Sequence, residues 1–479
     1  MSDTDTFGGG RPVLLRGGTV LPMDDPRRVL SNTDVLVQGD RITAIGPDLA
    51  VPPGSAVIDA SSGIVIPGMI DTHRHMWQTA LRGYGADWTL SQYFVWFFID
   101  HGKHFRPQDI HAGNLLAAAE ALDAGVTTTV DWSHGLATTD HAHAAVDALQ
   151  AVPGRFVLAY GNLHRPAAEW ATDPAFRAFL DQRVPRDGML DLQLAIDLGG
   201  DPSFPEKPAF EAARDLGVAV TTHAGVWGTA LDRSMTMLQQ HGCMRPGTVY
   251  VHGSSLGDDS YRRIADTGGY LSISAESEQH AGQGYPPTHA ARAHGIPVSL
   301  SMDTSVWWSA DLFSAMRATL AADRSREHAE GHARGESVTH TTLRAHDVLS
   351  WATRGGAAAL ARSDDLGTIE VGKKADLVLL KNDDSPVSFP LLNPHGHVVL
   401  QAQRSDVHTV LVNGHVAKYR HRLRGIDLRA LRDHVENTVE HLRGRLGESE
   451  WHKGMNPEVP RAKTIEQSRF GTKQPPTGQ

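Results

Sequence analysis

The sequence predicts an α/β fold: a (β/α)8 TIM barrel with a small β-sandwich domain built from N- and C-terminal segments. Three observations predict it. A chain of 479 residues is too long for one ordinary core and fits a barrel of about 250 residues plus a smaller domain. From about residue 64, apolar strand-like runs alternate with helical stretches. Residues 13–60 and 366–420 instead carry short β-rich runs divided by Gly and Asp.

The barrel is predicted from eight apolar runs with helical sequence between them. Near-continuous apolar strands alternating with helices are typical of a parallel sheet covered by helices, and eight such units are what a closed barrel requires. The candidate strands are "IVIPGMI" (64–70), "VTTTVDW" (126–132), "RFVLAYG" (155–161), "LDLQLAIDL" (190–198), "VAVTTHA" (218–224), "TVYVHG" (248–253), "GYLSIS" (269–274) and "IPVSLSMD" (296–303).

The domain boundaries follow from where these sequence patterns change. We expect a flexible leader at 1–12, a composite β-sandwich from 13–63 and 366–420, and the barrel at 64–365. Residues 427–446 place leucine and valine at helical spacing, so a C-terminal helix and an extended tail are expected over 421–479.

Composition excludes several classes of protein. A net charge of −10 argues against a dedicated nucleic-acid or anionic-membrane surface. Cys243 is the only cysteine, which excludes an intramolecular disulfide and fits a reducing cytoplasm. The start of the sequence lacks the pattern of a signal peptide, and no apolar run is long enough to span a bilayer.

Metal-capable side chains gather at the predicted carboxyl ends of the strands. In barrels of this kind the chemistry lies at that face, and side chains two residues apart on a strand share a side. Three imidazoles and one carboxylate suit Zn²⁺ or Fe²⁺, and the cysteine count leaves only histidine and carboxylates as ligands. The residues at these ends are His73 and His75 (first strand), His223 (fifth), His252 (sixth) and Asp303 (eighth).

Several segments together resemble the amidohydrolase superfamily. They are "PGMIDTHRH", "GVTTTVD", "TTHAG", "YVHG", "SMDTS" and "GTIEVGKKADLVLL", and the likeness spans residues 13–420. The branch that the sequence most resembles contains cytosine, S-adenosylhomocysteine and 8-oxoguanine deaminases and triazine hydrolases. The resemblance implies that His73, His75, His223 and Asp303 bind the metal, and that His252 polarises the substrate.

Two absences distinguish this sequence from the pattern of the family. Binuclear members carry a lysine on the fourth strand, and "LDLQLAIDLGG" has none, so one divalent ion is expected, Zn²⁺ first and Fe²⁺ second. The deaminases usually place a proton-shuttling glutamate three residues after the fifth-strand histidine, where this chain has Val226. Glu276 and Glu278, after the seventh strand, are the candidates for the missing acid; solvated or helix-capping carboxylates are the competing interpretation.

Other residues near the strand ends are candidates for substrate binding. Gln78 and Trp77 follow the metal-ligand pair, His134 ends "VDWSHG", and Trp227 and Trp307 could form an aromatic wall for a planar ring. Packing alone is the alternative for each. The apolar stretch 87–105 is expected to be a lid or a subunit contact.

These residues predict a metal-dependent hydrolase that acts on a C–N bond of a small nitrogen heterocycle, with hydrolytic deamination first. Metal-activated water attacks, Asp303 accepts its proton, and His252 stabilises the developing charge. Hydrolysis of a cyclic amide, urea or C–Cl bond is the alternative, and a catalytically silent binding barrel is a third possibility. The expected enzyme is a cytoplasmic homo-oligomer, a dimer or tetramer, with a small heterocyclic substrate and with neither nucleic acid nor membrane as partner.

Overall fold

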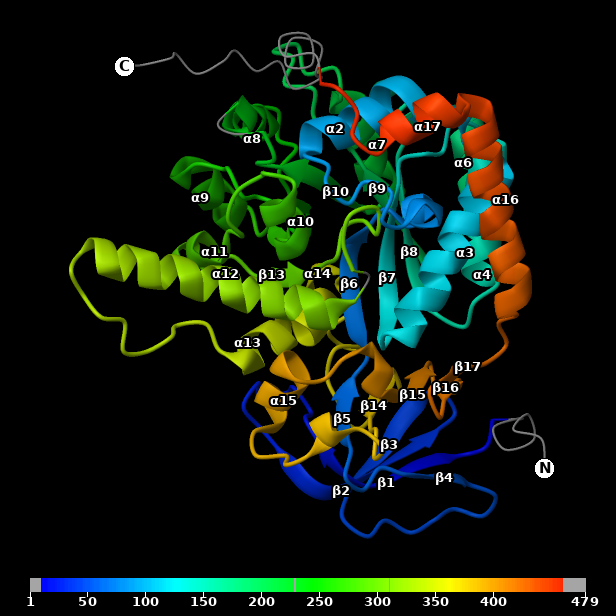
Figure 1. Cartoon of the computed structure of the whole chain (residues 1–479), viewed down its shortest axis with the longest axis vertical. Helices are drawn as coiled ribbons and strands as arrows, with labels where there is room; N and C mark the ends of the chain where they lie inside the picture. Colours follow the sequence, from blue (N-terminus) through cyan, green and yellow to red (C-terminus); the bar gives the residue numbers. More distant parts are fainter. Residues whose placement is uncertain (1–9, 228–229, 310, 460–479) are drawn as a thin grey trace.

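Two sheets organise the chain. The structure is a computed structural model, and it describes residues 10–227, 230–309 and 311–459. The expected leader falls mostly in 1–9 and the expected tail mostly in 460–479, so both lie largely outside the described residues. Figure 1 shows the barrel sheet above and the second sheet below it, joined by the run from β5 into β6.

The barrel sheet has eight parallel strands in the order β6-β7-β8-β9-β10-β11-β12-β13. All lie within or next to the predicted runs. A parallel bridge between Arg74 and Asp303 closes the sheet between its first and last strands. The TIM-barrel prediction is confirmed. The strands are β6 (Met69–Arg74), β7 (Val126–Ser133), β8 (Arg155–Tyr160), β9 (Leu190–Ala195), β10 (Ala219–Ala224), β11 (Val249–His252), β12 (Tyr270–Ile273) and β13 (Val298–Leu300).

The second sheet joins the two ends of the sequence. Its order is β17-β16-β15-β14-β5-β1-β2-β3, with β4 beside β1, and β14 pairs antiparallel with β5. The strands are β1 (Val13–Val20), β2 (Leu30–Gln38), β3 (Arg41–Gly46), β4 (Ala56–Asp59), β5 (Ile64–Pro67), β14 (Leu377–Leu380), β15 (Val407–Val412), β16 (His415–Tyr419) and β17 (Arg422–Leu423). The N- and C-terminal β segments, which were expected to share a small β-sandwich, thus lie together in one mixed sheet.

One predicted strand is divided in two. The run 64–70 crosses from the second sheet into the barrel, with β5 ending at Pro67 and β6 starting at Met69. Gly68 lies between them because a Cβ there would meet Thr127 Oγ1 at 2.1 Å. A continuous apolar run does not reveal such a crossing, since both halves are buried.

Helices cover the outside of the barrel. The principal ones are α3 (Pro107–Asp123), α4 (Thr139–Gln150), α5 (Ala167–Ala171), α6 (Pro174–Arg183), α7 (Lys207–Leu216), α8 (Ala230–Gln240), α9 (Asp258–Asp266), α10 (Ala275–His280), α11 (Thr288–His294), α12 (Leu312–Ala333), α13 (Ala345–Ser350) and α14 (Gly356–Ala359). In Figure 1 the far end of α12 projects away from the body, and α15 (Pro394–Leu400) lies beside the lower sheet. Among the described helices, none is both long and apolar enough to cross a membrane.

The C-terminal helix is present where the leucine spacing predicts it. The α16 helix (Leu428–Leu446) starts at Asp427, whose side chain accepts hydrogen bonds from the backbone N–H groups of Arg429 and Ala430. It runs along α3 and leads to α17 (Glu448–Gly454), at the top of the barrel in Figure 1. The last described residues therefore lie at the same end of the barrel as the carboxyl ends of its strands.

The predicted lid is a set of short helices between β6 and α3. It begins with η1 (Met76–Leu81) and continues through α2 (Leu90–Phe94), the π-helix η2 (Val95–His101) and η3 (Gly102–His104). Val95, Trp96 and Phe97 are buried within the chain itself. The run "FVWFF" is therefore mostly buried and offers little exposed apolar surface for the subunit contact that was the alternative to a lid.

Candidate active site

The predicted metal ligands meet at the carboxyl ends of the barrel strands. His73 lies on β6 and His75 directly after it, His223 is on β10, and Asp303 follows β13. Their ligand atoms are close together: His73 Nε2 is 3.3 Å from His223 Nε2, and Asp303 Oδ1 is 3.3 Å from His73 Nε2 and 3.4 Å from His75 Nε2. Two ligands of one tetrahedral zinc lie about 3.3 Å apart, so this spacing fits a single ion.

The protonation states of the cluster suit metal binding. Burial lowers the pKa of His73 well below its ordinary value and that of His75 to about 4. Burial alone raises the pKa of Asp303, but the hydrogen bond with His73 and the neighbouring His75 and His252 outweigh it and hold that pKa below its usual range. Neutral imidazoles and an ionised carboxylate are the forms that coordinate a divalent cation.

Two of the histidines are oriented by a partner on the other ring nitrogen. His223 Nδ1 is 2.8 Å from Asp197 Oδ1, and His75 Nδ1 is 3.1 Å from the carbonyl oxygen of Trp132. A hydrogen bond at Nδ1 fixes the tautomer that leaves Nε2 free as a ligand. Asp197 is a residue that the sequence reasoning missed, although it ends the predicted fourth strand at the same face of the barrel.

Asp303 is held by backbone pairing at the closing seam of the barrel. Its N–H donates to His73 O at 3.0 Å, and its carbonyl oxygen accepts from His75 N–H at 2.8 Å. Its φ is 64°, in the left-handed region that non-glycine residues seldom adopt. Such backbone strain persists only where the surroundings impose it, and it concentrates at functional sites.

His252 lies at the end of β11 and also has a positive φ, 72°. Its Nδ1 is 3.4 Å from Glu278 Oε1, which accepts a hydrogen bond from Ser274 N–H at 2.8 Å. Glu278 is fully buried, and burial raises the pKa of its carboxyl. The structure thus brings Glu278 next to His252, behind the metal-ligand cluster.

Glu276 lies in a different environment. Ser309 Oγ donates to its Oε1 at 3.2 Å, and burial, with Asp311 adding to it, raises its pKa to about 8. These neighbours belong to the segment that leads into α12, so the side chain of Glu276 is directed toward that helix. Neither Glu276 nor Glu278 lines the cavity over the ligand cluster, and the proton-donor role of either stays a prediction.

A small aromatic cavity lies over the ligand cluster. Its volume is about 50 Å³. The segment of short helices between β6 and α3 supplies much of its wall, and Trp227 and Trp307 supply more. Its described walls include two carboxylates, Asp197 and Asp303. The lining residues are His75, Leu90, Tyr93, Phe94, Phe98, Asp197, His223, Val226, Trp227, His252, Gln283, Asp303 and Trp307.

Two predicted substrate-binding residues lie behind this cavity. Trp77 is fully buried and packs edge-on against Phe97 and Phe105. Gln78 is also fully buried; its Nε2 donates to Tyr93 OH at 2.6 Å and its Oε1 accepts from Thr304 Oγ1 at 2.8 Å. Their geometry supports packing and positioning of Tyr93, and substrate contact by either stays a prediction.

His134 packs against His75, on the side of the cluster that faces a second cavity. Its ring centroid is 4.4 Å from that of His75, and the residue lines this second cavity, which adjoins the first. Asp197 lines both cavities.

The model of the amidohydrolase family matches residues 64–417, about three quarters of the chain. The chain belongs to the amidohydrolase family. It is thus a hydrolase that acts on C–N bonds, and both the resemblance and the (β/α)8 architecture predicted from the sequence are confirmed.

Relatives and solved structures of similar sequence extend over nearly the whole amidohydrolase chain. A 5-methylthioadenosine/S-adenosylhomocysteine deaminase of Desulfitobacterium hafniense is 28% identical, over 89% of this chain and 98% of its own length. A triazine hydrolase from Arthrobacter aurescens is 22% identical with a TM-score of 0.78, over 90% of this chain and 99% of its own. An adenosine deaminase from Xanthomonas campestris with bound zinc is 22% identical with a TM-score of 0.76, over 90% and 98%. At these identities the two structures show the shared fold.

Proposed function

We propose that this amidohydrolase catalyses hydrolytic deamination of an amino-substituted nitrogen heterocycle, with a purine nucleoside as the first class to test. Water replaces the exocyclic amine, giving the oxo product and ammonia. The observation that carries the proposal is that His73, His75, His223 and Asp303 lie together at the barrel rim, with ligand atoms 3.3–3.4 Å apart in three pairs, under an aromatic cavity. The similar proteins named as adenosine-type deaminases support the choice of substrate class.

The cluster fits one divalent ion, which we propose to be zinc, with iron(II) as the alternative. His73, His75 and His223 each present Nε2 and Asp303 presents Oδ1. The Nε2 atoms of His73 and His223 lie 3.3 Å apart, a spacing that two ligands of one ion would have. When bound, a divalent ion lowers the pKa of a coordinated water toward neutrality and so supplies the nucleophile.

The chain's own residues have three tasks in this proposal. Asp303 accepts the proton released by the water, and His252 stabilises negative charge that develops on the ring. Glu278 keeps His252 in position through their 3.4 Å contact and is the candidate source of the proton for the leaving amine. Tyr93, Phe94 and Trp307 exclude water and offer flat apolar surfaces to a planar ring.

Hydrolysis with a different leaving group is the second candidate. The specific observation that favours it is Val226, which lines the cavity at the position where the related deaminases usually have an acid. A C–Cl substrate depends less on a proton donor, because chloride leaves as an anion, whereas the ring nitrogen of a cyclic amide or urea still has to be protonated. A silent binding barrel is the least supported reading, because such a barrel has no need to keep strained residues at ligand positions.

The experiment is a panel of aminated and cyclic-amide heterocycles incubated with zinc-loaded enzyme, with ammonia release as the readout. We expect ammonia from at least one adenosine derivative. Conversion of cyclic amides alone would replace the first candidate by the second. His73→Ala should lose both metal, measured by elemental analysis, and turnover. The exposed-site variant His452→Ala should keep both, and full metal content in His73→Ala would contradict the ligand assignment.

We further propose a cytoplasmic homo-oligomer, a dimer or tetramer. The lone Cys243 supports a reducing compartment. The mass of the enzyme in solution by light scattering tests the assembly, and a monomer at micromolar concentration would contradict it.

A further inference from the structure

A second cavity adjoins the aromatic one on the side of Asp197. Its volume is about 290 Å³, against about 50 Å³ for the aromatic cavity. We call it the side chamber; His134, Asn162, Arg165, Asp197, Asp201 and Glu206 are its principal polar lining residues. Because Asp197 lines both spaces, a ring held over the metal ligands can extend a substituent past Asp197 into the side chamber.

The charges around the side chamber are mainly negative. Arg165 is the only arginine or lysine among its described lining residues, and its guanidinium is already paired with Asp173 at 3.0 Å. Asp201 is exposed, and hydrogen bonds from Ser203 lower its pKa, so it is ionised at neutral pH. With Asp197, Glu206 brings the carboxylates of the lining to three, and no ion pair between Glu206 and an arginine or lysine is found among the described residues. An anionic substituent is therefore disfavoured here.

Two buried polar atoms of the lining have no hydrogen-bond partner in the described structure. Glu206 is 8% exposed; its Oε1 accepts from Gly199 N–H at 2.7 Å, while its Oε2 is unpartnered. His134 is 2% exposed, and its Nε2 is unpartnered. A buried polar group without a hydrogen-bond partner destabilises the folded state, unless a ligand or water supplies that partner. A carboxylate oxygen can be completed only by a hydrogen-bond donor.

We propose that the side chamber binds a substituent of the substrate that carries hydrogen-bond donors and positive charge, with Glu206 as the residue that selects it. This inference rests on the proposed function, since it assumes that the ring lies over the metal ligands. The selected class is a heterocycle with an amine-bearing arm, and heterocycles with a carboxylate or phosphate arm are rejected.

The test compares two probes of similar size on the zinc-loaded enzyme, 5′-amino-5′-deoxyadenosine and adenosine 5′-carboxylate, with adenosine as the uncharged reference. We expect the amine to exceed the carboxylate in kcat/KM by about tenfold or more, mainly through KM. Glu206→Gln keeps the acceptor for Gly199 N–H but removes the charge, and it should bring the two probes to within about threefold. Glu211→Gln, a half-buried position on α7 outside the chamber, should keep the wild-type preference.

The two proposals fail in different ways. Ammonia release from adenosine with equal or better use of the carboxylate probe, or with a preference that Glu206→Gln leaves intact, overturns the side-chamber assignment alone. If no adenosine derivative releases ammonia, the proposed function fails, and calorimetric binding of the same two probes still decides the chamber. Tighter binding of the amine that weakens in Glu206→Gln supports it, and equal binding or no binding of the amine overturns it.

Discussion

Three structural features meet at Asp303. It presents a carboxylate to the metal-ligand cluster, it pairs through its backbone with His73 and His75, and it adopts a φ of 64°. The backbone pairing fixes where the carboxylate can lie, so the ligand geometry is set by the barrel rather than by a flexible loop. Rigid support of this kind is what precise metal and catalytic sites require.

Glu278 gives the first prediction at this scale. Glu278→Gln keeps the side-chain shape and the hydrogen bond from Ser274 but removes the carboxylate that faces His252. General acid–base assistance is worth about 10²–10⁴-fold, so we expect kcat to fall by about 10²-fold or more while metal content and KM stay near wild type. Steady-state kinetics at several pH values measure this, because loss of a titrating group also flattens one limb of the pH profile.

The companion variant Glu276→Gln is the matched control, since Glu276 is equally buried but is directed toward α12. Turnover within threefold of wild type in both variants would remove both glutamates from the mechanism. Asp303 would then be the remaining carrier of the proton to the leaving group.

Glu276 supports a prediction about stability. Its carboxyl ionises near 4.5 in an unfolded chain and near 8 in the folded one, because burial disfavours the charge. The folded state therefore binds this proton more tightly, and its contribution to stability is present below about pH 4.5 and is lost as the pH rises to 8. In this window the group lowers the free energy of unfolding by about 1.4 kcal/mol per pH unit.

Urea unfolding of wild type and Glu276→Gln at pH 5, 6, 7 and 8 measures this effect. The variant should show the shallower decline with pH. Parallel curves for the two proteins would mean that Glu276 is already ionised in the folded state.

That the candidate metal ligands lie at one rim of the barrel could be predicted from the sequence, whereas the contacts of their neighbours could not. His73, His223 and Asp303 each follow an apolar strand, and the strand-end rule places them on one face. Asp197 follows a strand too, but its pairing with His223 depends on a contact across two strands that no local pattern signals. Trp77 shows the converse, because its position beside the ligands in sequence says nothing of the direction in which its ring points.

At the scale of elements, the lid and the C-terminal segment are held together by hydrogen bonds. Tyr84 OH donates to the carbonyl oxygen of Trp451, and Trp88 Nε1 lies 3.1 Å from the carbonyl oxygens of Gly454 and Met455. Gln92 Nε2 donates to Asn456 Oδ1 at 2.7 Å. The lid forms part of the cavity wall with its inner side, so the C-terminal segment supports the active site from outside.

A chain that ends at Gly447 tests this support. It lacks α17 and leaves the buried donors of Tyr84 and Trp88 without acceptors, at a cost of about 1–3 kcal/mol for each. We expect a lower Tm and a KM raised by about tenfold, with metal content retained. A chain that ends at Val459 removes only residues 460–479 and is the control. Equal KM values for the two truncated enzymes would contradict a role of α17 in holding the lid.

The elements themselves were largely predictable, with two exceptions. Alternation of apolar runs and helical stretches locates all eight barrel strands, because each buried strand is apolar on both faces. The boundary between β5 and β6 is not visible in the same signal, since a strand that changes sheets stays buried throughout. The π-helical turn in the lid likewise has no pattern of its own in the sequence.

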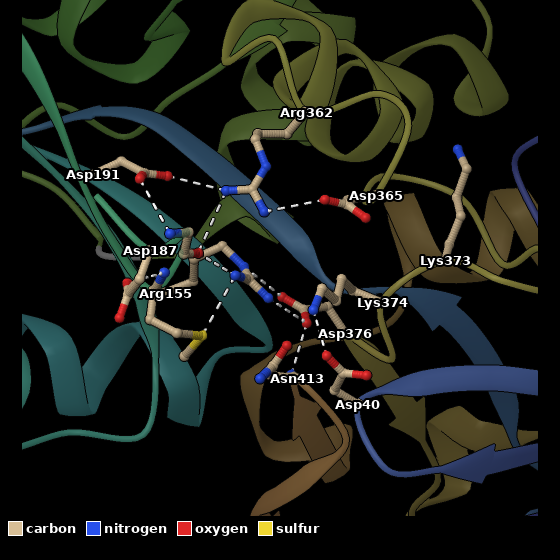
Figure 2. A network of polar contacts seen from close by, with 12 residues as sticks. Asp40, Arg155, Asp187, Asp191, Arg362, Asp365, Lys373, Lys374, Asp376 and Asn413 are labelled. Atoms are coloured by element: carbon tan, nitrogen blue, oxygen red, sulfur yellow. Dashed lines mark hydrogen bonds and ion pairs between the residues drawn. The ribbon is translucent and has the colours of Figure 1, made fainter. Parts of the chain in front are cut away.

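At the scale of the whole molecule, a network of charged residues joins the barrel to the second sheet. Figure 2 shows Arg155, at the start of β8, directed toward Asp376, next to β14. Their ion pair is 3.1 Å long and both side chains are buried. Asp376 also accepts from the N–H of Asn413 at 2.8 Å, and Arg362 pairs with Asp191 nearby at 3.0 Å. The network lies at the opposite end of the barrel from the metal-ligand cluster.

Arg155→Met should destabilise the fold strongly, because it leaves the Asp376 carboxylate buried without its cation. Removing one partner of a buried pair typically costs about 3–5 kcal/mol. Arg262→Met breaks the exposed pair with Asp258 and should cost about 1 kcal/mol or less. Equal costs in urea unfolding would contradict the distinction, and Arg155→Met combined with Asp376→Leu should recover part of the loss.

The contact that closes the barrel between its first and last strands also has a consequence for synthesis of the chain on the ribosome. Arg74 and Ser305, which contact each other across the seam, are 231 residues apart in the sequence. At about 5–20 residues per second, a ribosome needs roughly 10 to 50 seconds to make that stretch. Throughout that interval β6 has an open edge and His73 lacks Asp303. The cluster of His73, His75, His223 and Asp303 can therefore be complete only after the eighth strand has emerged, late in the synthesis of the chain.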